Sequence, residues 1–508
     1  MAHSPSDDQL VVDLPAGRLR GAAEGGLLVL RGVPYAEPPV GDLRWRPARP
    51  HTGWSGIRDA TADGPSAPQP YQEGGDPVLG GHGAPPFDED CLTLDVWTPA
   101  ADGARRPVLL WIHGGGFVSG SGSLPGYCGA TFARDGDLVV VSINYRLGPL
   151  GYLCLGPGEG SNHWLTDQLA ALCWVRENIA SLGGDPDCIT VAGQSGGAVS
   201  TAALAGHPQA QGLIKRVILQ SPPFGLDLPG PDAALERTAA FLELAGVENE
   251  AELRTLPWPA LIGAGLGLFA RTARWGYWPT PFLPVIDGPT LPRHPAEALL
   301  SGAAAGIDVM IGWTREEAAF GFALDAGYAA ATREQVIERI AETFGGARAP
   351  AVYAAYARSR PGARPHDVLM DLITDELFRA PAVRLAEARA ALGRPVRAYQ
   401  FDLPTPAYEG RLGAAHCLEL PFVFDNFDQW SHAPFLAGLA PAVRDGLAHA
   451  MHRAWIGFVR TGDPNHGGLP RWDPYDPGTR ATMRFDSVTG ALDDLAGDSR
   501  LLHLTRVT

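Results

Sequence analysis

The chain has 508 residues, and its 40 Lys and Arg against 56 Asp and Glu give a formal net charge of −16. This excess of negative charge argues against nucleic acids and anionic membrane surfaces as partners, because both attract clustered positive charge. The hydrophobic share of 45% and the charged share of 19% are typical of a globular protein. No apolar run approaches the roughly 20 residues of a membrane span.

The first ninety or so residues contain short apolar runs separated by turn signals such as "EPPVG", which predict short strands and loops. The opening "MAHSPSDDQL" has neither the basic nor the apolar region of a secretory signal. Six cysteines are scattered without C-x-x-C spacing, which favours reduced thiols over a disulfide framework or a zinc site. We therefore expect a cytoplasmic protein.

The first motif with chemical content follows an apolar strand predicted over residues 108–112. It reads "HGGGF" at 113–117. Three glycines directly after a strand allow backbone N–H groups to converge on one oxygen, as in an oxyanion loop. The alternative interpretation is a tight glycine turn with no catalytic role.

The second motif is "GQSGG" at 193–197, a G-x-S-x-G frame around Ser195. A β-branched run over 188–193 predicts a strand before it, and an Ala-rich stretch over 198–206 predicts a helix after it. This context suits a reactive serine, because the sharp turn exposes the hydroxyl and the helix N-terminus points free N–H groups at it. The frame alone is a weak signal in a chain with 63 glycines, but both motifs in this order are much rarer by chance.

The central sheet is expected over about 93–222, and helices over 232–246 and 332–393. The stretch 258–282 is apolar and contains three tryptophans, which predicts either a pocket wall for apolar groups or a plain packing loop. We find no internal repeat and no linker. The sequence therefore predicts one catalytic domain over 1–508.

Stretches spread over nearly the whole chain resemble those of the type B carboxylesterases, the α/β-hydrolase family that includes the cholinesterases and the bacterial para-nitrobenzyl esterases. They occur in the family's order and read "RGVPYAEPPVGDLRW" (31–45), "DEDCLTLDVW" (88–97), "WIHGGGF" (111–117), "INYRLGPLGYL" (143–153), "DQLAALCWVRENIASLGGDP" (167–186), "GQSGGA" (193–198), "GWTREEAAF" (312–320), "AAHCLELPFVF" (414–424) and "WIGFVRTGDPN" (455–465). The resemblance implies a central, mostly parallel, twisted β-sheet flanked by helices, with helical insertions that form the pocket wall.

A serine hydroxyl needs a base, and the base needs an acid that holds its tautomer. In this family the chain order is serine, acid, histidine. The resemblance places the acid at Glu317 and the base at His416, with Ser195 as nucleophile. Glu316 is the alternative acid, because only geometry separates two adjacent glutamates.

By the same resemblance, the backbone N–H groups of Gly115, Gly116 and Gly196 are the expected oxyanion donors. Two departures from the family concern the nucleophile's neighbours. Gly196 stands where the family usually has alanine. The glycine keeps the N–H donor but loosens the turn. Gln194 stands where the family usually has glutamate. The glutamine lacks the negative charge that would attract cationic substrates.

The loop at 68–90 lacks the tryptophan that holds quaternary ammonium in cholinesterases. The residues expected to line the substrate pocket are mostly aromatic: Phe117, Gln194, Phe224, Trp275, Trp278, Phe320 and Trp430. The expected activity is hydrolysis of neutral carboxylic esters with a short acyl group and an aryl, benzyl or alkyl alcohol, through an acyl-enzyme.

Carbamate or amide hydrolysis on the same triad is an alternative, and a non-catalytic binding module of the same fold is a distant one. No cofactor and no metal are expected, because His449 and His452 form a helical pair without an evident third ligand. The expected partner is a small-molecule ester, with no nucleic acid and no membrane, and the expected state is a monomer or homodimer.

Overall fold

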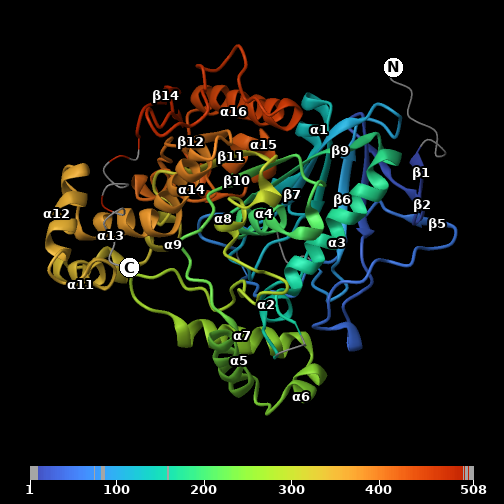
Figure 1. Ribbon diagram of the computed structural model, residues 1–508, viewed down its shortest axis with the longest axis horizontal. Coiled ribbons are helices and arrows are strands. Elements are labelled where there is room, and N and C mark those ends of the chain that lie inside the picture. Colours follow the sequence, from blue (N-terminus) through green and yellow to red (C-terminus); the bar gives the residue numbers. More distant parts are fainter. Residues whose placement is uncertain are drawn as a thin grey trace.

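The computed structural model describes residues 10–73, 75–81, 86–156, 160–495, 497 and 502. Its centre is a large mixed β-sheet with helices on both faces (Figure 1). In the described part of the chain this sheet has eleven strands, in the spatial order β14-β13-β12-β11-β10-β9-β7-β8-β6-β4-β3. The six pairs from β8 to β13 are parallel, and the four pairs at the two edges are antiparallel.

The strands of the large sheet are β3 (Ala22–Glu24), β4 (Leu27–Pro34), β6 (Thr93–Thr98), β7 (Arg106–Ile112), β8 (Val139–Ile143), β9 (Gly184–Gln194), β10 (Arg216–Gln220), β11 (Asp308–Thr314), β12 (Val396–Phe401), β13 (Thr482–Phe485) and β14 (Gly490–Leu492). A small separate sheet pairs β1 (Val11–Leu14), β2 (Gly17–Arg20) and β5 (Ile57–Asp59).

The α-helices are α1 (Ala130–Gly136), α2 (Gly148–Tyr152), α3 (His163–Asn178), α4 (Gly196–Gly206), α5 (Pro231–Ala245), α6 (Glu250–Thr255), α7 (Trp258–Thr272), α8 (Pro295–Ala298), α9 (Ala319–Phe322), α10 (Ala326–Ala329), α11 (Arg333–Phe344), α12 (Ala349–Ser359), α13 (Pro365–Thr374), α14 (Ala380–Ala391), α15 (Leu420–Phe424) and α16 (Pro441–Thr461). A π-helix, Asp375–Arg379, joins α13 to α14.

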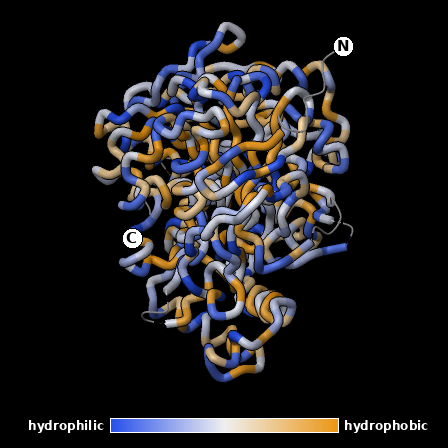
Figure 2. The backbone as a smooth tube through the Cα atoms, turned by 90° about the vertical axis from the view of Figure 1, so that its right-hand side faces the viewer, coloured by the Kyte–Doolittle hydropathy of each residue, from blue (hydrophilic) through white to orange (hydrophobic). Residues whose placement is uncertain are grey.

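The central strands are apolar on both faces because both faces are covered. Alternate residues of β7 show this division: Val108 and Leu110 lie in one hydrophobic core with α3, α4 and α14, while Leu109 and Trp111 lie in another with α1 and α16. Hydrophobic residues accordingly gather in the middle of the molecule (Figure 2). A two-sided core of this kind holds the carboxyl ends of the parallel strands rigidly, and these ends carry the site described below.

Helical insertions extend from the sheet at two places. Helices α5, α6 and α7 form a lobe below the sheet in the view of Figure 1, and α11, α12 and α13 lie at its left edge. The second group has its own core, in which α9 packs against α11, α12 and α13. The first insertion follows β10 and the second follows β11, so both leave the sheet at the carboxyl ends of these strands.

Three boundaries differ from the sequence-based expectation. The sheet is wider than the predicted span 93–222, because β3, β4, β11, β12, β13 and β14 join it from other parts of the chain. The helix predicted over 198–206 begins two residues earlier, at Gly196, since glycine propensity does not prevent a helix that the fold supports. The stretch 258–282 is helical up to Thr272, although it contains glycines.

No helix in the described ranges combines the length and apolar character needed to cross a bilayer. The organisation of 1–508 as one domain stays a prediction.

Candidate active site

Ser195 occupies the sharp turn between β9 and α4, at the carboxyl edge of the sheet. Its φ of 57° and ψ of −126° lie in a region that non-glycine residues rarely adopt. The flanking glycines permit this turn: a Cβ on Gly193 would lie 2.4 Å from the carbonyl oxygen of Gly197, and a Cβ on Gly197 would lie 2.1 Å from that of Ile112. The strained conformation is therefore imposed by close packing of β7, β9 and α4.

The glycine loop after β7 lies beside this turn, because a Cβ on Gly114 would be 3.1 Å from Cβ of Ser195. Gly115 and Gly116 have φ values of 116° and 61°, which favour glycine. Within the described part of the chain, the N–H groups of these two residues donate to no protein acceptor. Gly196 is the first residue of α4, where N–H groups have no helical partner.

The ring of Phe117 lies close to position 196. A Cβ on Gly196 would lie only 3.1 Å from the Phe117 ring, which is buried against Tyr152. The alanine usual in the family would therefore require the ring to move by a few tenths of an ångström.

His416 and Glu317 come from different loops and meet through a hydrogen bond. Nδ1 of His416 lies 2.5 Å from Oε2 of Glu317, and Oε1 of Glu317 accepts a second hydrogen bond from the N–H of Thr314 at 2.7 Å. Glu317 is fully buried and His416 is nearly so. Such a carboxylate fixes the tautomer of the imidazole, so that Nε2 is the nitrogen left to accept a proton.

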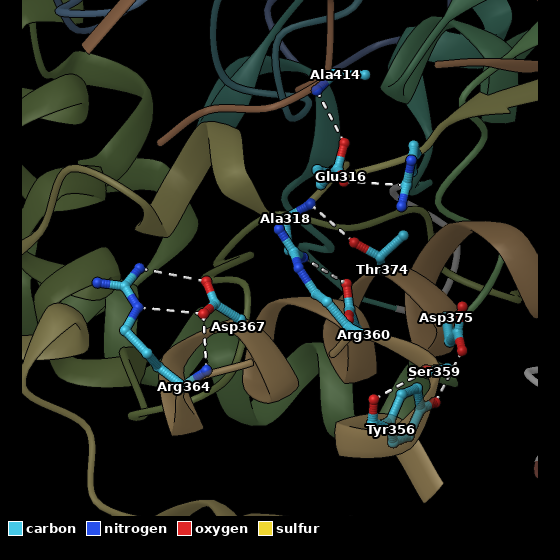
Figure 3. Close-up of polar contacts among 12 residues, drawn as sticks. Glu316, Ala318, Tyr356, Ser359, Arg360, Arg364, Asp367, Thr374, Asp375 and Ala414 are labelled. Atoms are coloured by element: carbon cyan, nitrogen blue, oxygen red, sulfur yellow. Dashed lines mark hydrogen bonds and ion pairs between the residues drawn. The ribbon is translucent and has the colours of Figure 1, made fainter. Parts of the chain in front are cut away.

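Glu316 points elsewhere. Its Oε2 accepts a hydrogen bond from the N–H of Ala414 at 2.9 Å (Figure 3). Its own N–H donates to the Ala414 carbonyl at 3.0 Å. Gly413 is needed beside this contact, because a Cβ there would lie 2.7 Å from Oε2 of Glu316. Glu316 thus clamps the segment that precedes His416, and only Glu317 contacts the imidazole.

Gln194 fills the space between the serine turn and the histidine. Its Nε2 lies 3.1 Å from Nε2 of His416 and 3.3 Å from Sγ of Cys417. Its Oε1 would lie 2.7 Å from a Cβ on Gly114. The amide therefore places Ser195 and His416 in the same small volume without adding charge.

Aromatic rings surround His416. The ring centroid of Phe378 lies 5.1 Å from that of His416, and those of Phe320 and Trp278 lie 5.9 and 6.0 Å away. Trp278 and Phe320 stack on each other with an interplanar angle of 10°. Sequence reasoning missed Phe378, because its segment had only a helical composition; a π-helix inside an α-helical run often marks a functional site, but no sequence signal showed it.

Three other expected pocket residues have ring contacts outside the cluster around His416. Phe224 packs edge-on against His294, and Trp275 stacks on Tyr328. Trp430 packs against Tyr127 and lines an open surface groove of about 480 Å³. Their place in the substrate pocket stays a prediction.

Two buried groups near the site have shifted pKa values. Burial lowers the pKa of His113 to about 4, so this histidine, which stacks on Tyr145, stays neutral. Burial and the nearby Glu317 raise the pKa of Glu419 to about 7. Oε1 of Glu419 accepts a hydrogen bond from Gln220. Within the described residues no cluster of three or more His, Cys, Asp or Glu side chains could hold a metal ion.

Together these groups present a serine hydroxyl at the start of a helix, an imidazole oriented by a buried carboxylate, and glycine N–H groups beside them. This arrangement is suited to acyl transfer, in which the base takes the serine proton and backbone donors stabilise the oxyanion. A model of the carboxylesterase family matches residues 8–496 of the chain. The chain belongs to the carboxylesterase family.

The curated relatives are hydrolases of similar length. The phenmedipham hydrolase of Pseudarthrobacter oxydans is 53% identical over 460 residues, which cover 91% of this chain and 92% of the relative. The para-nitrobenzyl esterase of Bacillus subtilis is 36% identical, with 96% and 97% covered. A solved carboxylesterase of Geobacillus stearothermophilus is 39% identical, covers 97% of this chain and 99% of its own, and superposes with a TM-score of 0.85.

The family and the α/β-hydrolase fold predicted from the sequence are therefore confirmed. The protein is a carboxylic ester hydrolase that acts on small-molecule esters.

Proposed function

We propose that Ser195 is the nucleophile of this carboxylesterase and that His416 and Glu317 are its base and acid. The observation that carries the proposal is the buried His416–Glu317 hydrogen bond, formed next to the strained turn that holds Ser195. The base takes the serine proton as the hydroxyl attacks the ester carbonyl, and then gives it to the leaving alcohol. Water deacylates the acyl-enzyme by the reverse route.

The oxyanion of each tetrahedral intermediate is stabilised by the N–H groups of Gly115, Gly116 and Gly196. Such donors act strongly because they are fixed before the reaction and lie in a site with little water. The free N–H groups of the glycine loop and the start of α4 support this assignment.

The preferred substrates in our proposal are neutral esters with a short acyl group and an aryl or benzyl alcohol. Flat apolar surface lies next to His416, supplied by Trp278, Phe320 and Phe378. An aryl group of the substrate gains binding free energy there by burying apolar area and contacting the rings. Gln194 supplies an uncharged amide where a carboxylate would attract a cation.

Aryl carbamates are a second class of substrate on the same machinery. The relative with 53% identity is named for hydrolysis of phenmedipham, a carbamate. A carbamate carbonyl is attacked in the same way as an ester carbonyl, and the carbamoyl-enzyme is then hydrolysed. We further propose that the protein works in the cytoplasm without a cofactor, as a monomer or homodimer.

A matched substrate panel tests the substrate class. It compares kcat/KM for p-nitrophenyl acetate, butyrate and palmitate, benzyl acetate, phenmedipham and butyrylthiocholine. We expect the short aryl and benzyl esters to be hydrolysed best and the choline ester at least tenfold less well than neutral butyrate. A kcat/KM for butyrylthiocholine equal to that for p-nitrophenyl butyrate contradicts the charge argument. A higher kcat/KM for the palmitate than for the short esters contradicts the short acyl pocket.

A further inference from the structure

A buried ion pair joins α11 to the π-helix close to the site. Arg339 lies on α11 and Glu376 in the π-helix, with side chains that are 4% and 6% exposed. Nη2 of Arg339 pairs with Oε2 of Glu376, and Thr343 donates a hydrogen bond to Oε1 of Glu376 at 2.5 Å. Because buried charges are costly unless paired, this network favours keeping α11 and the π-helix in contact.

Arg339 also holds the loop that carries Trp278. Its Nε donates to the carbonyl of Gly276 at 2.9 Å, and its guanidinium lies 3.8 Å from the ring centroid of Tyr277. Trp278 follows directly in the chain and lies against His416. Arg339 thus holds the two residues that precede this tryptophan and does not itself contact the histidine.

Glu376 holds the opposite side of the same aromatic cluster. Phe378, two residues further along the π-helix, is nearer to His416 than Phe320 or Trp278. The backbone of the π-helix also fixes the loop after β10, because Leu377 accepts a hydrogen bond from the N–H of Gly225 at 2.9 Å. A Cβ on Gly225 would lie 1.8 Å from the Glu376 carbonyl, so this contact requires glycine.

We propose that Arg339 and Glu376 are positioning residues of the substrate pocket, which hold Trp278 and Phe378 against His416 and so set the preference for aryl groups. The inference rests on the proposed function, because it concerns the aryl preference stated there. An aryl group gains from these rings only if they are already in place, since ordering them on binding would reduce the affinity. The pair contacts no reacting atom.

The test is the double variant Arg339→Met, Glu376→Leu, which replaces both charges by apolar side chains of similar length. Such replacements of buried ion pairs are often neutral or stabilising, so the protein should fold. The variant loses the hydrogen bond to Gly276. We expect the ratio of kcat/KM for benzyl acetate to that for ethyl acetate to fall about tenfold, through a higher KM for the benzyl ester, while kcat for ethyl acetate stays within about threefold.

Hydrogen–deuterium exchange of peptides that cover 274–280 and 375–380 gives a readout that does not depend on substrate. Faster exchange in both peptides is expected in the double variant. The matched control is Arg364→Met at the N-cap of α13, which breaks the exposed ion pair with Asp367 seen in Figure 3. Exposed ion pairs contribute little to stability, so neither the benzyl-to-ethyl ratio nor the exchange of the two peptides should change.

An unchanged benzyl-to-ethyl ratio in a folded double variant, with unchanged exchange, overturns the inference. If the wild type shows no aryl preference but exchange still rises, the proposed substrate class fails and the anchoring role stands. If the double variant does not fold, Arg339→Lys decides the question. A lysine ammonium cannot serve Glu376 and Gly276 together as the planar guanidinium does. The KM for benzyl acetate must therefore rise in that variant.

Discussion

Nδ1 of His416 lies 2.5 Å from Oε2 of Glu317, while the adjacent Glu316 binds the backbone of Ala414. The two neighbouring glutamates thus have different partners on the same loop. One orients the imidazole directly, and the other holds the segment on which the imidazole stands. This division leads to distinct expectations for substitutions at the two positions.

Glu317→Gln should lower kcat by about 10²–10⁴-fold, because the neutral amide no longer supports the imidazolium. Glu316→Gln should cost little, since its amide oxygen still accepts from Ala414. Glu316→Ala removes that acceptor and should lower activity by an intermediate amount. Steady-state kinetics of the three variants with p-nitrophenyl acetate provide the comparison, with circular dichroism as a check of folding. Equal losses in both glutamine variants would contradict the assignment of the acid.

Ser195→Ala should reduce kcat on the order of 10⁴-fold or more, because only binding and oxyanion assistance remain. An organophosphate should label the wild type on Ser195 and leave the variant unlabelled, as read by peptide mass spectrometry. Ser200 and Ser221, which are buried nearby, are the internal controls. A label on either of them would show that the nucleophile is assigned wrongly.

Gln194→Glu places a carboxylate about 3 Å from Nε2 of His416, at the position now held by the amide. The added negative charge stabilises the protonated imidazole. The acid limb of the pH profile of kcat/KM should therefore move to higher pH, and activity below neutral pH should fall. Hydrolysis of butyrylthiocholine should improve relative to p-nitrophenyl butyrate. The comparison variant Gln194→Met has no charge and should leave the acid limb in place; a shift there would point to packing instead.

The ionisation of Glu419 should make the free energy of unfolding depend on pH. Burial raises its pKa from 4.5 to about 7 in the folded protein, so the folded state binds more protons than the unfolded state between these values. Its contribution to the free energy of unfolding therefore falls as pH rises through this window. The Glu419→Gln variant has no carboxyl group to ionise at this position. Between pH 5 and pH 8 its free energy of unfolding should therefore fall less than that of the wild type, with a difference on the order of 2 kcal/mol.

Thermal or urea unfolding at the two pH values measures this difference. The matched control is Glu250→Gln, because Glu250 is a partly exposed carboxylate paired with Arg254. That variant should follow the wild type across the pH range, apart from a small uniform offset. Parallel pH curves for the wild type and the Glu419 variant would show that Glu419 does not titrate in this window.

The sequence by itself determined the family and the fold, and it predicted the local parts of the site. The strand-turn-helix around Ser195 and the glycine loop after β7 are short contiguous segments. Their geometry follows from φ preference and from the absence of a Cβ, both of which are visible in the residue types. The catalytic roles of Ser195, Glu317 and His416 stay predictions that the variants above test.

Only the tertiary structure decided which side chains meet across distant segments. The separation of Glu316 from Glu317, the contact of Gln194 with His416 and the Phe378 ring beside His416 join loops far apart in the chain. No periodicity or spacing encodes such contacts, because they depend on where each insertion returns to the sheet. The buried Arg339–Glu376 pair shows the same point: each residue alone is a charged helix position, and only packing removes both from water.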